Sequence, residues 1–233
     1  MEITLILFVK NEIDGLQKVF PRINRADFTE IIAIDGKSTD GSVEFLKNKK
    51  VKVYTQDADG VREALWLGFS KIKTEYVMLF SPDNNSDPKE IPKLINKCKQ
   101  GYDLVIASRY FNGSKSEDDT FGSMIGNKYF TNLINFLFRT KFTDALNIYK
   151  IFRTNLIKDL DITRKSVGSD YIDLTINWRA GIKKIKIAEV PTIEHERVVG
   201  GKVSRAHPGI LGKFKSSFVF HRSIIRDFFF YKW

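Results

Sequence analysis

The feature of this 233-residue chain that most constrains its fold is a regular alternation of short apolar runs with helical patterns. Between the runs, apolar side chains recur three and four positions apart, which is the spacing of one helix face. The runs expected to be strands are residues 3–9, 31–34, 51–55, 76–80 and 104–108. Strands that alternate with helices form parallel sheets with helices on both faces. The sequence therefore predicts an α/β fold with a mostly parallel central sheet.

Beyond residue 109 the alternation is less regular, but further elements of both kinds are expected. They are a polar loop at 112–120, a helix that includes residues 130–137, an extra strand at 145–152, a helix at 170–180 and a strand at 182–190. No linker rich in Pro, Gly or Ser divides the chain. We therefore expect one domain over residues 1–207.

Residues 208–233 form a basic, aromatic tail that we expect to be helical. Its apolar side chains approximate one helical face, namely Ile210, Leu211, Phe214, Phe218, Ile225, Phe228 and Phe229. Lys and Arg fill much of the rest. A basic amphipathic helix of this kind binds an anionic membrane surface, or packs its aromatic side chains on the domain or on another subunit of a homo-oligomer.

Charge and cysteine content narrow the choice of partners and compartment. The 38 Lys and Arg residues outnumber 28 Asp and Glu, and the net charge of +10 favours phosphorylated small molecules or anionic lipid. No nucleic-acid-binding motif appears, so we expect no nucleic acid partner. The lone Cys98 excludes an internal disulfide. With no signal peptide or apolar run of about 20 residues, we expect a cytoplasmic protein, either free or peripheral on the inner face of the membrane.

Polar side chains follow the predicted strands at the ends where ligands bind in open α/β sheets. They are Asn11 and Glu12, then Asp35, then Asp57 and Asp59, then Asp83 and Asn85, then Arg109. The alternative is that they only form turns, as Asp and Asn often do. Asp83 and Asn85 offer a carboxylate and an amide oxygen, which are ligands for Mg²⁺ or Mn²⁺. Water and a diphosphate would complete such a metal site.

Several segments, in order, resemble the family 2 glycosyltransferases of the GT-A fold, especially the dolichyl-phosphate mannose synthase-like branch. The segments are LILFVKNE (5–12), IIAIDGKSTDGS (31–42), GVREALWLGF (60–69), YVMLFSPDNNSDP (76–88), VIASRYFNGS (105–114), FTDALNIYKIFR (142–153) and EVPTIEHERVVGGKVS (189–204). The resemblance implies a nucleotide-binding half (1–110) and an acceptor half (111–207). It also implies an inverting transfer of sugar from a UDP- or GDP-sugar to a lipid-linked or glycan acceptor in cell-envelope polysaccharide synthesis.

The resemblance also implies roles for individual residues. The nucleotide sugar would be bound by Phe8, Lys10, Glu12, Asp35, Arg62, Asp83, Arg197 and Lys202, and the divalent metal by Asp83 and Asn85. The acceptor would be bound by Arg109 and Asn127. If the acceptor is a hydroxyl, a general base is needed; Asp144 is the first candidate, and Asp118 and Asp119 follow. For Asp144 the alternative is a turn or a cap at a strand end.

The chain departs from the family pattern at several positions. Ser81 replaces the first Asp of the metal motif, Gly36 replaces an Asp, and Lys10 replaces a Tyr near the base. Residues 121–127 lack an Arg that helps hold a lipid phosphate acceptor. Two alternatives therefore stay open: a polyprenyl-phosphate sugar synthase, and a non-catalytic module that binds sugar nucleotides or membranes.

Overall fold

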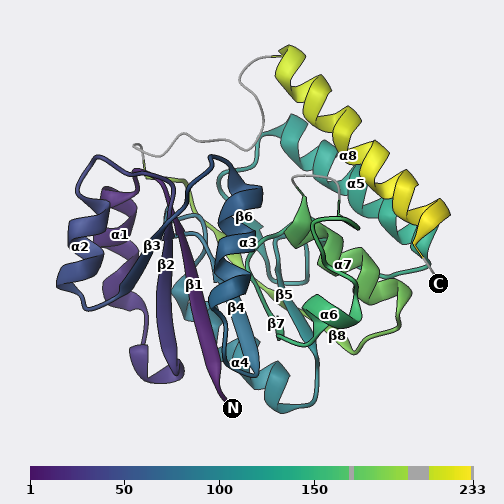
Figure 1. Cartoon of the computed structure of the whole chain (residues 1–233). Helices are drawn as coiled ribbons and strands as arrows, with labels where there is room; N and C mark the ends of the chain where they lie inside the picture. Colours follow the sequence, from purple (N-terminus) through teal and green to yellow (C-terminus); the bar gives the residue numbers. More distant parts are fainter. Residues whose placement is uncertain (168–170, 199–209, 232–233) are drawn as a thin grey trace.

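The computed structural model describes residues 1–167, 171–198 and 210–231, with the backbone alone for 210–216. Seven strands form a central sheet in the order β3-β2-β1-β4-β7-β5-β8 (Figure 1). They are β1 (Ile3–Val9), β2 (Glu30–Asp35), β3 (Lys52–Thr55), β4 (Tyr76–Phe80), β5 (Leu104–Ser108), β7 (Lys150–Arg153) and β8 (Ile187–Pro191). Neighbouring strands run parallel except where β7 pairs with β4 and β5. The predicted α/β fold with a mostly parallel sheet is confirmed.

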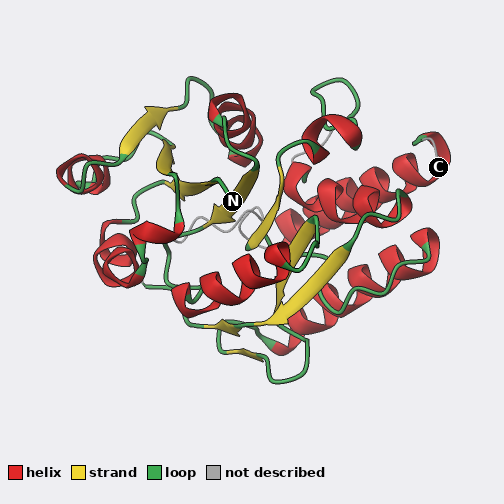
Figure 2. Cartoon of the chain, turned by 90° about the horizontal axis from the view of Figure 1, so that it is seen from below, coloured by secondary structure: helices red, strands yellow, loops and turns green. Residues whose placement is uncertain are grey.

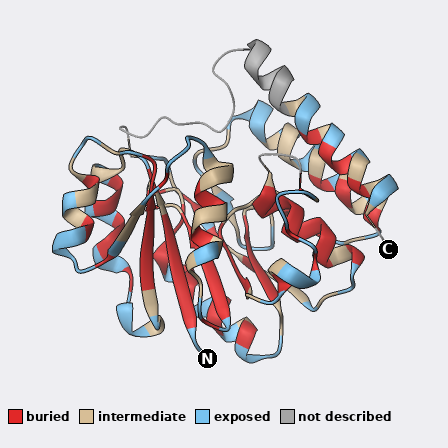
Figure 3. Cartoon of the chain, viewed as in Figure 1, coloured by how far each residue is buried: buried red, intermediate tan, exposed pale blue. Residues whose placement is uncertain are grey.

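The alternation of side chains along the strands gives the protein two apolar cores. In β1, Leu5 and Leu7 face one core, whereas Ile6 between them faces the other. The first core packs against α1 (Ile13–Val19), α2 (Ser42–Asn48) and α4 (Ile91–Lys99). The second packs against α3 (Val61–Lys71), α5 (Phe121–Phe138), α6 (Leu156–Asp159), α7 (Ile172–Ile182) and α8 (Ile210–Phe230). Helices thus cover both faces of a buried sheet (Figures 2 and 3).

Short elements complete the part of the chain that the structure describes. Within it, three 3-10 helices occupy Phe20–Arg22, Arg25–Asp27 and Pro88–Glu90. A two-stranded sheet joins β6 (Lys115–Ser116) to β9 (Ile193–Glu194), and Glu194 also forms an isolated bridge with Ser86. The second sheet brings the segment after β8 close to the segment after β5, and the bridge brings it close to the segment after β4.

The predicted extra strand at 145–152 is longer than the one observed. β7 begins at Lys150, because the side chain of Asn147 fixes the preceding residues in a loop. Its amide nitrogen donates to the Ala107 carbonyl oxygen at 2.7 Å, and its amide oxygen accepts from the Tyr149 N–H at 3.0 Å. The strand expected at 182–190 likewise begins only at Ile187, after α7 ends in a turn where Lys184 has a φ of 53°.

The tail is helical, as expected, but the face that packs on the domain differs from the predicted apolar face. Phe220 and Ile224 are buried, whereas Phe218, Ile225 and Phe229 are exposed. The side chains of Ile210, Leu211 and Phe214 lie outside the described part. Asp227 determines which face of α8 packs on the domain, because its buried carboxylate accepts hydrogen bonds from Trp178 and Arg179 of α7. No helix in the described ranges combines the length and the apolar character needed to cross a bilayer.

Candidate functional site

A cavity of about 410 Å³ opens at the carboxyl ends of β1, β2, β4 and β5. Parallel strands end at the same edge of the sheet, so the loops that follow them surround one space. The lining residues are Phe8, Val9, Lys10, Glu12, Ile34, Gly36, Gln56, Gly60, Val61, Ala64, Ser81, Asp83, Asn85, Ser86, Arg109, Leu146, Asn147, Ile148, Glu194 and Arg197. The cavity therefore joins polar side chains from both halves of the chain.

One end of the cavity is apolar with a single amide on its wall. Phe8, Ile34 and Val61 line it, beside Gln56. The Gln56 side-chain nitrogen donates to the Ala58 carbonyl oxygen at 2.8 Å, and its amide oxygen has no hydrogen-bond partner among the described residues. An apolar slot with a free acceptor suits a flat heterocycle that carries an N–H group.

The next part of the cavity carries a carboxylate and a guanidinium. The Nε atom of Arg197 lies 3.7 Å from Asp83 Oδ2 and 3.3 Å from Asp118 Oδ2. Backbone pairing holds Arg197 there: the His195 N–H donates to the Asn85 carbonyl oxygen at 3.0 Å, and the Val198 N–H to that of Asp83 at 3.1 Å. An anion that enters this part would meet Arg197, and a cation would meet Asp83.

Glu12 also faces this part of the cavity. Burial and the neighbouring carboxylate of Asp83 raise the pKa of Glu12 to about 8, although Arg197 partly offsets them. A divalent cation between the two carboxylates would relieve their repulsion, and the Asn85 amide oxygen lies on the same wall. Within the described residues no group of three or more His, Cys, Asp or Glu side chains could hold a metal alone. The residues therefore fit a metal only if a ligand supplies further oxygen atoms.

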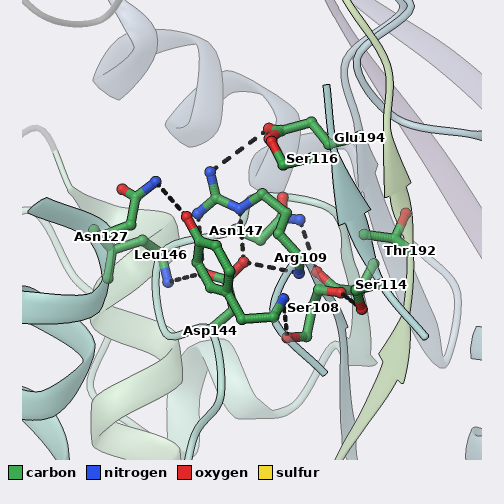
Figure 4. Close-up of polar contacts among 12 residues, drawn as sticks. Ser108, Arg109, Ser114, Ser116, Asn127, Asp144, Leu146, Asn147, Thr192 and Glu194 are labelled. Atoms are coloured by element: carbon green, nitrogen blue, oxygen red, sulfur yellow. Dashed lines mark hydrogen bonds and ion pairs between the residues drawn. The ribbon is translucent and has the colours of Figure 1, made fainter. Parts of the chain in front are cut away.

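Arg109 forms the opposite wall, between two carboxylates (Figure 4). Its Nε and Nη2 atoms donate to Asp144 at 2.7 and 3.0 Å, and its Nη1 atom lies 3.6 Å from Glu194. Burial opposes ionisation of Asp144, but the adjacent guanidinium outweighs burial and lowers the pKa of this carboxyl. Asp144 is fully buried and does not line the cavity. It therefore orients Arg109.

Comparison with known proteins identifies the family. The model of "Glycosyl transferase family 2" matches residues 4–161. The chain belongs to this family. It is 26% identical over 194 residues to glycosyltransferase AglJ of Haloferax volcanii, which covers 82% of this chain and 62% of AglJ. It is 31% identical over 127 residues to a dolichol-phosphate mannosyltransferase of Pyrococcus furiosus, covering 51% of this chain and 36% of that protein. The chain thus spans less than two thirds of either relative.

A solved structure confirms the fold of this family 2 protein. It is glucosyl-3-phosphoglycerate synthase from Mycobacterium tuberculosis in complex with Mn²⁺, UDP and glucosyl-3-phosphoglycerate. The TM-score is 0.66 at 17% identity, over 96% of this chain and 77% of that one. The family resemblance seen in the sequence and the expected GT-A fold are both confirmed.

The structure places some predicted donor residues of this family 2 protein on the cavity and others beside it. Phe8, Lys10, Glu12, Asp83, Asn85 and Arg197 line it. Asp35 does not, because its buried carboxylate accepts from the N–H groups of Lys37 and Ser38, each at 3.1 Å. Gly36 lines the cavity in its place. Arg62 lies outside the lining, at 3.9 Å from Glu63, and Lys202 lies outside the described residues.

Asn127, predicted to bind the acceptor, and Asp119, a candidate general base, belong to a second polar group next to Arg109. Tyr110 donates its hydroxyl hydrogen to Asp119, and the Asn127 amide donates to the Tyr110 oxygen at 2.9 Å. Asp118 pairs with Arg197. Neither Asp118, Asp119 nor Asn127 lines the cavity. Asp119 and Asn127 instead hold Tyr110, the residue that follows Arg109, in place behind the wall of the cavity.

Glu194 is a site residue that the sequence analysis did not single out. It lines the cavity, where it accepts a hydrogen bond from the Ser116 hydroxyl and pairs with Arg109. Burial raises the pKa of Glu194, in part against the effect of Arg109. Its only signal in the sequence is an acidic residue shortly after a predicted strand. Pairing of β9 with β6 is what turns it into the site.

Proposed function

We propose that this protein transfers a sugar, with inversion, from a UDP- or GDP-sugar to a hydroxyl of a lipid-linked or glycan acceptor in cell-envelope polysaccharide synthesis. The observation that carries the proposal is the spatial order of apolar and polar surfaces within one cavity. In the order of the strands across the sheet, an apolar slot with Gln56 comes first, then Asp83 with Arg197, then Arg109 with Glu194. This order matches a base, a diphosphate and a reacting sugar with its acceptor.

On the donor side, Phe8 and Lys10 would contact the nucleoside. Asp83 and Asn85 would hold Mg²⁺ or Mn²⁺ together with diphosphate oxygens. A bound metal would neutralise the charge that develops on the leaving diphosphate. Arg197 would leave Asp83 for the diphosphate and stabilise the same charge from the other side. Lys202 is proposed for the same role from sequence alone.

On the acceptor side, Glu194 is better placed than Asp144 to accept a proton from a hydroxyl. It reaches the cavity, and burial raises its pKa, which makes the carboxylate a stronger base. Asp144 keeps a lowered pKa and is occupied by Arg109. Two carboxylates also offset the charge of Arg109, which favours a hydroxyl acceptor over a phosphate.

A polyprenyl-phosphate sugar synthase is the second candidate. It is favoured by the similarity to the dolichol-phosphate mannosyltransferase, and it would need no general base, because a phosphate acceptor is already anionic. Replacement of Glu194 distinguishes the two candidate functions, because it should disable transfer to a hydroxyl and spare transfer to a phosphate.

The test is to incubate the full chain with a panel of UDP- and GDP-sugars and Mn²⁺ or Mg²⁺, and to measure release of UDP or GDP. Glycan, lipid-linked sugar and polyprenyl-phosphate acceptors form separate arms. Release that one acceptor stimulates, and that Asp83→Asn abolishes, supports the proposal. Nucleotide binding by calorimetry without turnover in any arm would instead identify a non-catalytic binding module.

A further inference from the structure

The outer faces of α5 and α8 form the most apolar exposed surface of the described residues. Nine of the twelve exposed large hydrophobic side chains lie on these two helices. We call this set the α5–α8 face: Phe121, Ile125, Tyr129 and Phe136 of α5, with Phe218, Val219, Ile225, Phe229 and Phe230 of α8. Exposure reaches 82% at Phe136 and 70% at Phe218. Apolar side chains gathered in this way mark an interaction site.

The two helices run side by side and in the same direction (Figure 1). Phe130 packs on Phe220 with ring centroids 4.7 Å apart, and Phe138 on Phe228 at 6.3 Å, so both helices advance by eight residues between contacts. The Tyr129 hydroxyl lies 3.0 Å from His221 Nε2. Tyr129 is one of the exposed side chains of α5, so the exposed apolar side chains of the two helices lie on either side of the contact between them.

The charges on this face are of one sign. Residues 121–138 include no Asp or Glu, and residues 210–230 include only Asp227. Asp227 is 1% exposed and bonded to Trp178 and Arg179, so neither helix presents a carboxylate among the described side chains. Lys128 and Arg222 are exposed. The ammonium group of Lys128 also lies 5.7 Å from the ring centroid of Tyr110, and it stays exposed. A parallel pair of helices with aromatic side chains and exposed cations suits the interface of an anionic bilayer.

We infer that the α5–α8 face binds the surface of a membrane that contains anionic lipid. A second copy of the chain is a poorer occupant, because it would bring Lys128 and Arg222 toward like charges with no carboxylate to balance them. Lipid offers acyl chains to the aromatic side chains and phosphate groups to the cations at once. The sequence suggested membrane binding for the tail alone, and the inference extends this role to α5.

The face adjoins the acceptor end of the cavity. Asn127 of α5 bonds to Tyr110, which follows Arg109 in the chain, and Arg109 lines the cavity. Docking on α5 and α8 therefore brings that wall near the bilayer, where a lipid-linked acceptor is found. Only this last step rests on the proposed function; membrane binding itself does not.

The experiment is co-sedimentation of the full chain with phosphatidylcholine vesicles and with vesicles that also contain phosphatidylglycerol. One variant combines Phe136→Ser, Phe218→Ser and Phe229→Ser, and a second combines Lys128→Glu and Arg222→Glu. The matched control combines Lys18→Glu and Lys47→Glu, an equal charge change at exposed positions of α1 and α2, across the sheet. Circular dichroism and a thermal shift with UDP and GDP check that each variant folds and keeps its nucleotide site.

The original chain should pellet with anionic vesicles, more at low salt. The triple Ser variant should bind at least about tenfold more weakly, because each exposed Phe loses its transfer to the interface. The Lys128 and Arg222 variant should lose the preference for anionic lipid, and the control should bind as the original chain does. Failure of the original chain to pellet, or equal binding by all variants, would overturn the inference. So would a dimer in light scattering that the triple Ser variant abolishes without any vesicle binding. Because vesicle binding needs no sugar transfer, it can succeed while the proposed activity fails.

Discussion

Asp144 lies 35 residues from Arg109 in the chain, yet it accepts three hydrogen bonds from it. Two come from the guanidinium and the third from the Arg109 backbone N–H at 3.1 Å. Glu189 in turn accepts the backbone N–H groups of Thr143 and Asp144 at 2.8 and 2.9 Å. The wall of the cavity therefore rests on a chain of hydrogen bonds, in which Glu189 holds the backbone at Asp144 and Asp144 positions the arginine.

Replacement Asp144→Ala should strongly destabilise the protein. It leaves the Arg109 guanidinium buried with Glu194 as its one remaining carboxylate partner among the described residues. Breaking such a pair costs about 3–5 kcal/mol of unfolding free energy. Because the pKa of Asp144 is lowered, its contribution is present above about pH 4 and is lost as the pH falls further. Urea unfolding at pH 7 and pH 3 measures both effects. An equal loss at the two pH values would contradict the ionic explanation.

Glu194→Gln should impair catalysis far more than folding. Loss of a general base lowers kcat for a hydroxyl acceptor by about 100-fold or more, while the amide keeps the shape of the side chain. The donor KM should change little, and the acidic limb of the pH–rate profile should disappear. The comparison with Asp144→Ala is informative, since that variant should lose stability first. Unchanged kcat in Glu194→Gln would assign the base elsewhere.

Asp83→Asn should weaken metal-dependent nucleotide binding, on the order of 100-fold, because the metal loses its only carboxylate on that loop. Arg197→Ala should weaken binding of UDP or GDP even without metal, since it removes the cation that faces the diphosphate. Calorimetry with and without Mn²⁺ separates the two effects. Lys52→Ala, at an exposed pair with Glu30, provides a control that should bind as the original protein does. Equal affinity of the original chain with and without Mn²⁺ would contradict the role of Asp83.

Glu12→Gln should stabilise the free protein increasingly as the pH rises from 5 to 8. The pKa of Glu12 is raised to about 8, so in this range the unfolded chain loses a proton that the folded chain retains. Folding is therefore penalised more at higher pH, and the amide removes the penalty. Because Glu12 is only partly buried, the gain is on the order of 1 kcal/mol at pH 8. Thermal melts across this range test the sign.

Several features of the site were accessible from sequence. Residues 31–42 carry a family motif, and Asp83 and Asn85 follow a buried strand, so both could be placed at one edge of the sheet. Arg197 could be expected there from resemblance, and the structure brings it to 3.7 Å from Asp83. Asp35 shows where prediction from sequence stops. Its place at the end of a strand was predicted, but its carboxylate accepts hydrogen bonds from the N–H groups of the loop that follows and does not face the cavity.

The sequence by itself determined the order of strands and helices along the chain, the apolar packing on both faces of the sheet and the edge of the sheet that carries the site. These follow from local periodicity: alternate residues such as Leu5 and Ile6 must face opposite sides of a strand. Only the tertiary structure decided that β7 runs antiparallel, that Glu194 enters the cavity, that Asp144 is committed to Arg109 and that α8 buries Phe220 while it exposes Phe218. Each of these depends on contacts between segments far apart in the chain, which no local pattern of apolar and polar residues encodes.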